Sequence, residues 1–241
     1  MKIDVLPVFG KQTDYQLQDT TVIVVDVLRA TTSIITALNG GAIKVVPTVD
    51  AGDAVALASR LGMRECVLGG ERGGVKISGF ELGNSPEEYL SRAVRGKTVI
   101  VSTSNGTGAL HSVRSAENVF IGAMINRTSA AKAAAAESKD ILIVCAGTDG
   151  QPSADDLCTA GAIIDAVRVY ADPRPGELSD MALLCETLYN NWKAGSFDLS
   201  CTFHYSRLCA MGFDEDVRFC FTPDTTDTVP VYKDGVIVKY R

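Results

Sequence analysis

A carboxylate, Asp26, directly follows the apolar run Val22–Val25, and Arg29 stands three residues after it. A carboxylate at such a position can hold Mg²⁺ through oxygen, and a guanidinium can bind a phosphate-like anion. Thr31 and Thr32 come next, at the start of a helical pattern, where a hydroxyl can cap the helix and face a phosphate. An acid and an arginine at this spacing exceed what a helix cap requires, so we take them as candidate catalytic residues. Capping alone is the alternative.

The loop Ser102–Gly108 is the best candidate for an anion-binding turn. It joins an apolar run to a helical pattern through hydroxyls, an amide and two glycines, so that backbone N–H groups can approach an oxyanion. It is neither a Walker loop, because no Gly-Lys-Ser/Thr follows, nor a dinucleotide fingerprint. An ordinary glycine turn is the alternative. Its candidate substrate-binding residues are Ser104, Asn105, Gly106 and Thr107.

Glu71 and Arg72 stand between two glycine pairs in the segment Leu68–Gly74. This segment is too rich in glycine for a regular element, so we expect a loop. Its acid offers a metal ligand or a base, and its guanidinium offers an anion-binding group. A surface turn whose charges are solvated explains the same residues equally well.

Further acids follow the apolar run Ile141–Val144, namely Asp149, Asp155 and Asp156. A helix dipole favours acids near its N-terminus, so each of them alone is weak support for a site. Together with the two acids described above, they supply enough oxygen donors for one octahedral magnesium ion.

Familiar hydrolase motifs are missing. The Cys-x₅-Arg pattern would need arginine where Gln151 stands, and the Asp-x-Asp pattern would need an acid where Leu28 stands. Ser104 lies in no Gly-x-Ser-x-Gly elbow. Of the two histidines, His111 falls within a helical pattern, and His204 is a weaker candidate than the loops, with a role at the edge of a site left open.

The elements that must position these loops follow an α/β order. Apolar runs that are continuous rather than alternating predict strands buried on both faces. Their alternation with helical patterns predicts a three-layer α/β/α fold with a largely parallel or mixed sheet. Thr21–Val24 recurs as Thr98–Val101, which chance explains better than an internal duplication. We expect one compact unit over residues 1–241, with two fused, similar lobes as the alternative.

Several local signals mark where elements begin and end. Asn39–Gly41 is typical of a helix C-terminus, and Ser85–Glu88 has the Ser-Pro-x-Glu pattern of a capping box. Ser153–Asp156 is an acidic variant of that box. Towards the C-terminus we expect helices at about residues 179–194 and 199–211, and a hairpin of Val229–Tyr232 and Val236–Val238 around an Asp234–Gly235 turn.

Composition excludes several classes of protein. The net charge is −6 and the pI about 5.0, so the surface repels nucleic acids and anionic membranes, and we expect neither as a partner. No apolar run approaches the roughly 18 residues that cross a bilayer, and the N-terminus lacks the apolar region of a signal peptide. Seven scattered cysteines without a Cys-x-x-Cys pair favour reduced, mostly buried thiols over a disulfide framework or a zinc site. We therefore expect a cytoplasmic protein.

Five short stretches, in this order, resemble the 2-phosphosulfolactate phosphatase family. They are Val25–Thr32, Gly70–Arg72, Leu82–Pro86, Thr103–Thr107 and Cys145–Gly147. The similarity runs from about residue 4 to the end and includes His204, Ser206, Arg207 and Val229–Pro230. The resemblance implies a phosphoric monoester hydrolase that converts (R)-2-phospho-3-sulfolactate to 3-sulfolactate and phosphate with Mg²⁺, a step of coenzyme M biosynthesis.

That substrate carries phosphate, sulfonate and carboxylate groups, so an acidic protein needs several convergent cationic and N–H donors to bind it. The hypothesis assigns catalysis to Asp26, Arg29 and Glu71, and metal binding to Asp26, Glu71, Asp155 and Asp156. It assigns substrate binding to Thr31, Thr32, Arg72, Ser104, Asn105, Gly106, Thr107 and Arg127. Attack by Asp26 on phosphorus and attack by a metal-bound water both stay open.

The alternatives are a hydrolase of another small phosphate ester and a non-catalytic protein that binds a small anion. A nucleotide-dependent oxidoreductase ranks last, because the glycine fingerprint and the ribose-binding acid are missing. A homo-oligomer is expected on base rates alone.

Overall fold

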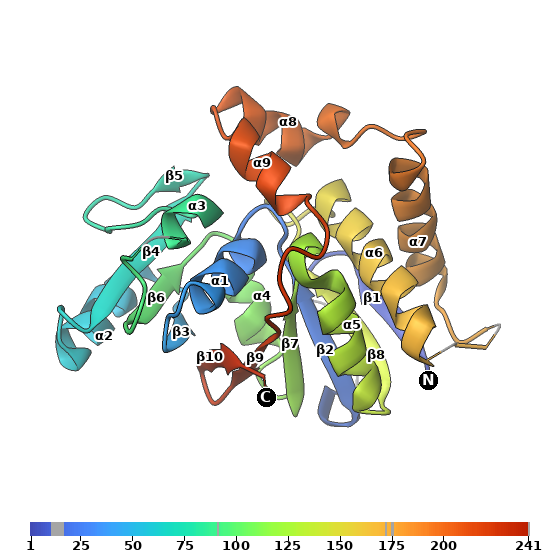
Figure 1. Cartoon of the computed structure of the whole chain (residues 1–241), viewed down its shortest axis with the longest axis horizontal. Coiled ribbons are helices and arrows are strands. Elements are labelled where there is room, and N and C mark those ends of the chain that lie inside the picture. Colours follow the sequence, from blue (N-terminus) through green and yellow to red (C-terminus); the bar gives the residue numbers. More distant parts are fainter. Residues whose placement is uncertain (11–16, 91, 172, 175, 241) are drawn as a thin grey trace.

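The computed structural model describes residues 1–10, 17–90, 92–171, 173–174 and 176–240. Within them, ten strands form one mixed sheet (Figure 1). The strands are β1 Ile3–Leu6, β2 Thr20–Val25, β3 Lys44–Pro47, β4 Cys66–Arg72, β5 Val75–Lys76, β6 Thr98–Ser102, β7 Asn118–Gly122, β8 Asp140–Cys145, β9 Pro230–Lys233 and β10 Val236–Lys239. The helices are α1 Ala30–Asn39, α2 Ala51–Leu61, α3 Pro86–Tyr89, α4 Gly106–Ser112, α5 Arg127–Ala136, α6 Ala154–Ala171, α7 Asp180–Lys193, α8 Phe203–Ala210 and α9 Asp214–Cys220.

The sheet consists of two parallel groups joined by a hairpin, in the order β1-β8-β2-β7-β9-β10-β3-β6-β4-β5. One group is β1, β8, β2 and β7, and the other is β3, β6 and β4. Between them lie β9 and β10, the hairpin predicted around Asp234–Gly235. The successive pairings β7–β9, β9–β10 and β10–β3 are all antiparallel, so the two groups run in opposite senses.

The hairpin holds its neighbours through few residues. Ile237 pairs with Val45 of β3, and two residues of β9 pair with β7. Short pairing allows a sharp bend there, which adds to the ordinary twist between strands. Residues at the carboxyl ends of β2, β8, β4 and β6 consequently line one pocket, although the two groups run in opposite senses. Helices α8 and α9 lie above this meeting point (Figure 1).

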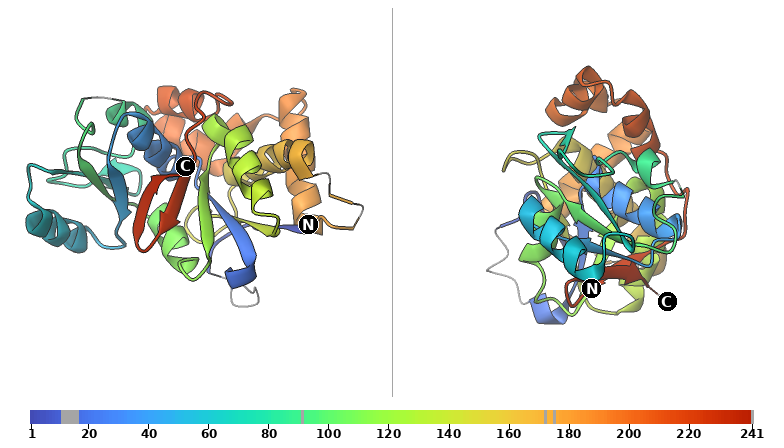
Figure 2. Two further views of the ribbon diagram at one scale, coloured as in Figure 1. Left: turned by 60° about the horizontal axis from the view of Figure 1, so that its bottom comes forward. Right: turned by 90° about the vertical axis from the view of Figure 1, so that its left-hand side faces the viewer.

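The central strands are buried on both faces. Val22–Val25 of β2 are fully buried, and the apolar residues of β6 and β8 are buried almost as completely. Helices α5 and α6 pack against the first group, α2 packs against β4 and β6, and α1 packs near the hairpin (Figure 2). The predicted α/β fold, with a mixed sheet between helical layers, is confirmed.

The expectation that Leu68–Gly74 is a loop was wrong, because most of it forms β4. A Cβ on Gly69 would overlap the hydroxyl of Tyr89, and a Cβ on Gly70 would overlap the carbonyl oxygen of Ser102. These glycines therefore mark close approaches of neighbouring groups to a strand, which glycine permits. The glycine-rich composition reflects packing rather than a lack of regular structure.

Both predicted capping boxes were wrong, although the helices begin where expected. Pro86 opens α3 after Ser85, but the Ser85 hydroxyl donates to Asp216, and Glu88 accepts from the N–H of Gly83. At the start of α6, Asp156 accepts N–H groups from other loops rather than from Ser153. In both cases distant partners outcompete the local box.

The C-terminal part agrees with the sequence in outline. Helix α7 begins after Ser179, whose hydroxyl accepts from the N–H of Ala182. The helix expected at 199–211 is divided into a single 3₁₀ turn, Leu199–Cys201, and α8. Helix α9 was not predicted.

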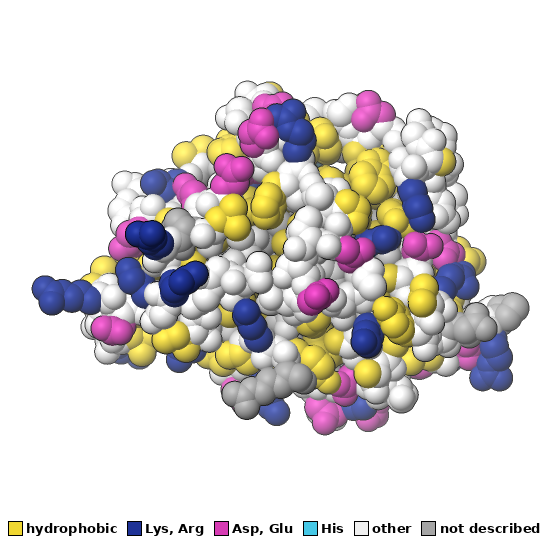
Figure 3. All heavy atoms as spheres, viewed as in Figure 1, with side chains coloured by type: hydrophobic (Ala, Val, Ile, Leu, Met, Phe, Trp, Pro, Cys, Tyr) yellow, Lys and Arg dark blue, Asp and Glu magenta, His cyan; other side chains and the backbone are white. Residues whose placement is uncertain are grey.

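The surface seen in Figure 3 carries basic and acidic side chains interspersed, with apolar ones between them. Across the described part of the chain, no helix is long and apolar enough to cross a membrane. All seven cysteines are free, and five of them are buried, as expected for reduced thiols. Charges that could recruit an anionic ligand must therefore be sought in local clusters.

Helix α6, whose first turn carries Asp155 and Asp156, is fixed by close packing on α7. A Cβ on Gly161 would overlap the carbonyl group of Cys185 and crowd the side chain of Tyr189. The glycine therefore sets how closely the two helices approach.

We predict that Gly161→Ala destabilises the protein by at least about 2 kcal/mol, since overpacking outweighs the better helix propensity of alanine. Urea unfolding followed by circular dichroism measures the loss. An increase in stability would show that α6 and α7 can separate freely.

Candidate active site

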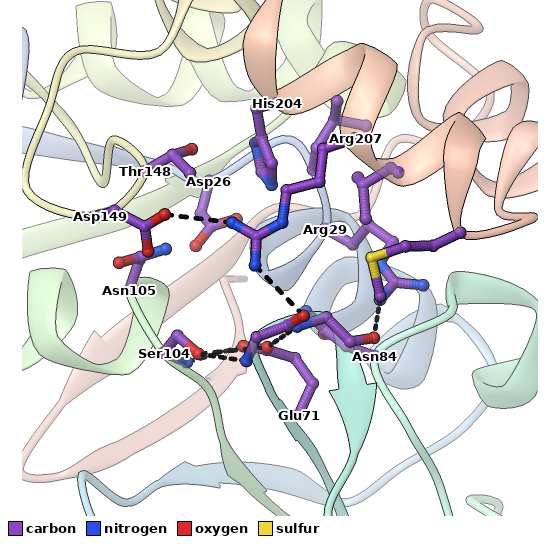
Figure 4. A pocket seen from close by; sticks show the side chains of 15 residues that line it. Asp26, Arg29, Glu71, Asn84, Ser104, Asn105, Thr148, Asp149, His204 and Arg207 are labelled. Atoms are coloured by element: carbon purple, nitrogen blue, oxygen red, sulfur yellow. Dashed lines mark hydrogen bonds and ion pairs between the residues drawn. The ribbon is translucent and has the colours of Figure 1, made fainter.

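A pocket lies where the strand ends of both groups meet the underside of α8 (Figure 4). It encloses about 40 Å³. Its polar lining combines acids, cations, amides and hydroxyls from six segments of the chain. These residues are Asp26, Arg29, Glu71, Asn84, Ser104, Asn105, Thr148, Asp149, His204 and Arg207.

Asp26 is held rigidly at the end of β2. Its Oδ1 accepts the N–H of Ala30 at 3.1 Å, and its own N–H donates to the hydroxyl of Thr31 at 3.1 Å. The carboxyl is only 6% exposed. Burial raises its pKa to about 6, with the charges of Glu71 and Asp155 adding to the rise and the Ala30 N–H and His204 opposing it.

Glu71 connects two loops of the second strand group. Its Oε1 accepts the N–H of Ser104 at 2.7 Å, and its Oε2 accepts the N–H of Gly74 at 2.7 Å. The Ser104 hydroxyl also donates to Oε2, at 3.2 Å. A single buried carboxylate thus fixes the turn after β4 against the loop after β6.

Arg29 enters the pocket as one partner of a buried ion pair. Its Nη1 lies 2.5 Å from Oδ2 of Asp216 in α9, and its Nη2 donates to the carbonyl of Gly74 at 3.0 Å. The guanidinium also stacks on Phe213, 4.0 Å from the ring centroid. Ser85 donates to the other oxygen of Asp216 at 2.6 Å. Because these partners constrain it, Arg29 is a fixed charge rather than a mobile one.

Helix α8 contributes two residues that the site hypothesis omitted, His204 and Arg207. His204 Nδ1 lies 3.0 Å from Oδ2 of Asp155. Burial disfavours the protonated ring, but the hydrogen bond to Asp155 and its charge outweigh this and raise the pKa of His204. Arg207 Nη1 lies 3.1 Å from Asp149. Their spacing of three residues places both on one face of a helix, which is the signal that could have found them.

The structure separates the roles of Asp155 and Asp156. Asp155 is turned to His204 and to the hydroxyl of Ser153. Asp156 accepts the N–H of Val27 at 2.8 Å and that of Gly147 at 3.0 Å, so it ties the loop after β2 to the loop after β8. Burial and the neighbouring acids raise the pKa of Asp156 well above its usual range, although both N–H donors oppose the rise.

Several predicted substrate-binding residues do not line the pocket. Thr31 and Thr32 donate to the backbone carbonyls of Asp26 and Val27, in the loop between β2 and α1. Arg72 donates to its neighbour's carbonyl, to Val49 and to Ser102. Thr107 exchanges hydrogen bonds with Thr103, and Gly106 packs against Asp26. These contacts make them supports of the loops.

Arg127 lies apart from the pocket. It pairs with Asp224 at 3.0 Å and with Asp165 at 3.6 Å, and it contacts the hydroxyl of Tyr189. Among the residues predicted from the sequence, the structure brings to the pocket Asp26, Arg29, Glu71, Ser104 and Asn105.

The donor set fits a magnesium ion bound by few protein ligands. Within the described residues, no three His, Cys, Asp or Glu side chains converge as a metal cluster, so the four predicted acids are not gathered around one point. Magnesium keeps several waters and takes one or two carboxylates. Asp26 and Glu71 line the same pocket, and their oxygens retain lone pairs beyond those used by N–H donors.

The cationic side chains of the pocket all have acidic partners, but two of its acids have no cationic partner among the described residues. Arg29 is neutralised by Asp216, Arg207 by Asp149 and His204 by Asp155. In the part of the chain that the structure describes, Asp26 and Glu71 have no ion-pair partner. The pocket therefore carries uncompensated negative charge next to two arginines.

We predict that Asp26→Asn becomes more stable relative to the wild type as pH rises. Asp26 has a folded pKa of about 6 against 3.8 ordinarily, so its contribution to stability is lost as pH rises through about 6. In EDTA, the difference in free energy of unfolding should grow by about 2 kcal/mol between about pH 4 and pH 8. A difference independent of pH in urea titrations would mean that Asp26 titrates as an ordinary carboxyl.

We predict that Asp216→Ala costs about 3–5 kcal/mol, because it leaves Arg29 buried without its ionic partner. The matched control is Glu215→Ala on the same helix, whose exposed pair with Arg218 should contribute little to stability. Chemical unfolding of the two variants provides the comparison. Equal small losses would show that the buried pair is not needed to hold α9.

Comparison with known proteins identifies the family of the chain. A family model described as 2-phosphosulpholactate phosphatase matches residues 9–235. A protein of Caldanaerobacter subterraneus subsp. tengcongensis is 40% identical over 93% of this chain and 92% of its own length. Proteins of Clostridium novyi and Clostridium beijerinckii are 37% and 39% identical over 99% and 98% of this chain and 100% and 99% of theirs. All three are named "Probable 2-phosphosulfolactate phosphatase". The chain therefore belongs to the 2-phosphosulfolactate phosphatase family of phosphoric monoester hydrolases.

Proposed function

We propose that this protein is a magnesium-dependent phosphatase that hydrolyses (R)-2-phospho-3-sulfolactate to 3-sulfolactate and phosphate. The observation that carries the proposal is the placement of Asp26 and Glu71, two acids without ion-pair partners among the described residues, in one pocket with Arg29 and Arg207. The family membership points to the same ester.

The charge balance supports the need for a cation. The substrate would bring phosphate, sulfonate and carboxylate charges towards two unpaired carboxylates. Repulsion between like charges at short distance would oppose binding unless a cation lies between them. Asp26 and Glu71 would hold Mg²⁺. When bound, it would offset the charge of the phosphoryl oxygens and orient the ester for in-line attack.

The remaining residues would bind and orient the ester. Arg29, fixed by Asp216 and Phe213, presents positive charge to the pocket without having to be ordered on binding. Ser104 and Asn105 offer a hydroxyl and an amide at the pocket wall. Asp155 holds His204 at Nδ1 and favours the protonated ring, and only the protonated ring can donate from Nε2 a hydrogen bond to the ester oxygen that leaves phosphorus.

The attacking group is either Asp26 or a water activated beside it. A deprotonated Asp26 is required in both cases, and its pKa of about 6 leaves it mostly ionised at neutral pH. The free thiols support a reducing compartment, so we propose that the reaction takes place in the cytoplasm. The product would serve coenzyme M synthesis or another use of sulfolactate.

We predict phosphate release from 2-phosphosulfolactate that EDTA abolishes and Mg²⁺ restores. Asp26→Ala should lower kcat by at least about 100-fold, because it removes both a metal ligand and the group nearest the reaction. The control is Arg60→Ala, an exposed residue of α2 that does not line the pocket, and it should retain full activity. Phosphoglycerate and an aryl phosphate complete the substrate panel.

Each alternative function has its own outcome in this assay. Faster hydrolysis of phosphoglycerate than of 2-phosphosulfolactate would identify a phosphatase for another ester. Folded protein that binds 3-sulfolactate without turnover of any ester would identify a binding protein. Activity unchanged by EDTA would contradict the metal requirement.

A further inference from the structure

Arg207 spans the mouth of the pocket between the two strand groups. Its Nη1 contacts Asp149, in the loop after β8, at 3.1 Å. Its Nη2 donates at 3.4 Å to the carbonyl of Gly73, in the turn after β4. Figure 4 shows the side chain descending from α8 with its guanidinium between these two sides. Access to Asp26 and Glu71 therefore passes this guanidinium.

The space beneath Arg207 is too small for the proposed substrate. The pocket encloses about 40 Å³, room for a few water molecules, whereas small-molecule sites usually have about 300 Å³ or more. A three-carbon frame with three anionic groups does not fit there entirely, so part of it must lie outside this space, at the mouth beside Arg207.

The contacts of Arg207 are of the kind that exchange readily. Its side chain is 36% exposed and that of Asp149 is 66% exposed. Solvent-exposed ion pairs contribute little to stability, so little is lost when Asp149 is replaced by another anion. Arg29, in contrast, is 2% exposed and has two fixed partners, Asp216 and the Gly74 carbonyl. Of the two arginines, Arg207 is the one able to change partner.

The neighbouring cavity does not offer an alternative anion receptor of equal strength. It encloses about 460 Å³ and shares Thr148, Asp149 and His204 with the pocket. Its remaining lining residues are neutral, including Pro152 and Phe203. An anionic group at the mouth is therefore attracted to Arg207, away from Asp149.

We infer that Arg207 determines substrate specificity by exchanging Asp149 for an anionic group of the ester that is not transferred, its sulfonate or its carboxylate. The inference rests on the proposed function and adds to it the residue that recognises the far end of the substrate. With phosphate held near Asp26 and Glu71, the rest of the molecule extends to the mouth, where a planar guanidinium can bind either oxyanion through two N–H groups.

Steady-state kinetics of Arg207→Met and Arg207→Lys with three esters test this inference. The esters are 2-phosphosulfolactate, 2-phospholactate, which lacks the sulfonate, and 4-nitrophenyl phosphate, which lacks both groups. We expect Arg207→Met to raise KM about 10- to 100-fold for 2-phosphosulfolactate, with a smaller rise for 2-phospholactate and the smallest for the aryl ester. Arg207→Lys should recover part of the loss. Equal effects on the first two esters would assign Arg207 to the carboxylate rather than the sulfonate.

Two further variants exclude a merely structural effect. Asp149→Asn removes the competing carboxylate and should lower KM for 2-phosphosulfolactate by about 2- to 5-fold, a gain that no folding defect produces. Arg218→Met changes an exposed arginine of α9 that pairs only with its helix neighbour Glu215 in the described contacts, and it should leave KM unchanged.

The outcomes separate this inference from the proposed function. Wild-type protein that fails to hydrolyse 2-phosphosulfolactate overturns the proposed function and the inference together. Active wild-type protein with the same KM after Arg207→Met overturns the inference alone. A fall in kcat of equal size for all three esters also overturns it, because Arg207 would then act on the phosphoryl group.

Discussion

The direction of the strands is the constraint on which the site depends. Two parallel groups that ran in opposite senses in a flat sheet would place their carboxyl ends at opposite edges. Here the hairpin β9–β10 joins the groups through short pairings, which permit a bend or a strong twist between them. The acid after β2 and the acid at the end of β4 consequently line the same pocket. The pocket exists only because both groups and the hairpin are in place.

Buried charge then holds the walls of the pocket in position. Three buried carboxylates near the site connect segments distant in sequence: Asp156 connects the loops after β2 and β8, Glu71 the turn after β4 and the loop after β6, and Asp216 α9 and Arg29. Burying a charge is costly unless hydrogen bonds satisfy it; backbone N–H groups satisfy most of Asp156 and Glu71, whereas Arg29 and the Ser85 hydroxyl satisfy Asp216. The site is therefore rigid on its strand side. On its α8 side, the pair of His204 with Asp155 is buried, whereas the pair of Arg207 with Asp149 is exposed.

The features that depend on local sequence pattern could be predicted from the sequence. The features that depend on tertiary contacts could not. Continuous apolar runs identified β2, β6 and β8, and position after a strand identified Asp26 as a site residue, because both follow from short-range rules. The glycines of β4 were misread, since what approaches Gly70 is the backbone of Ser102, which no local pattern encodes. Arg127 was placed in the site by type alone, whereas three distant partners hold it elsewhere. Arg207 was missed because its helix reaches the pocket only in the folded chain.

The central hairpin also has a consequence for how the chain is made. Its residues, 230–239, follow every other described strand in the sequence and leave the ribosome after them, yet they lie in the middle of the sheet. Until they emerge, β7 and β3 are open edges, and open edges invite pairing with other chains. The sheet therefore cannot be completed until the hairpin has been synthesised. Contacts between residues so distant in sequence are also slow to form. The growing chain does not itself cover the edges of β7 and β3. Cellular factors must therefore keep these edges from pairing with other chains during synthesis.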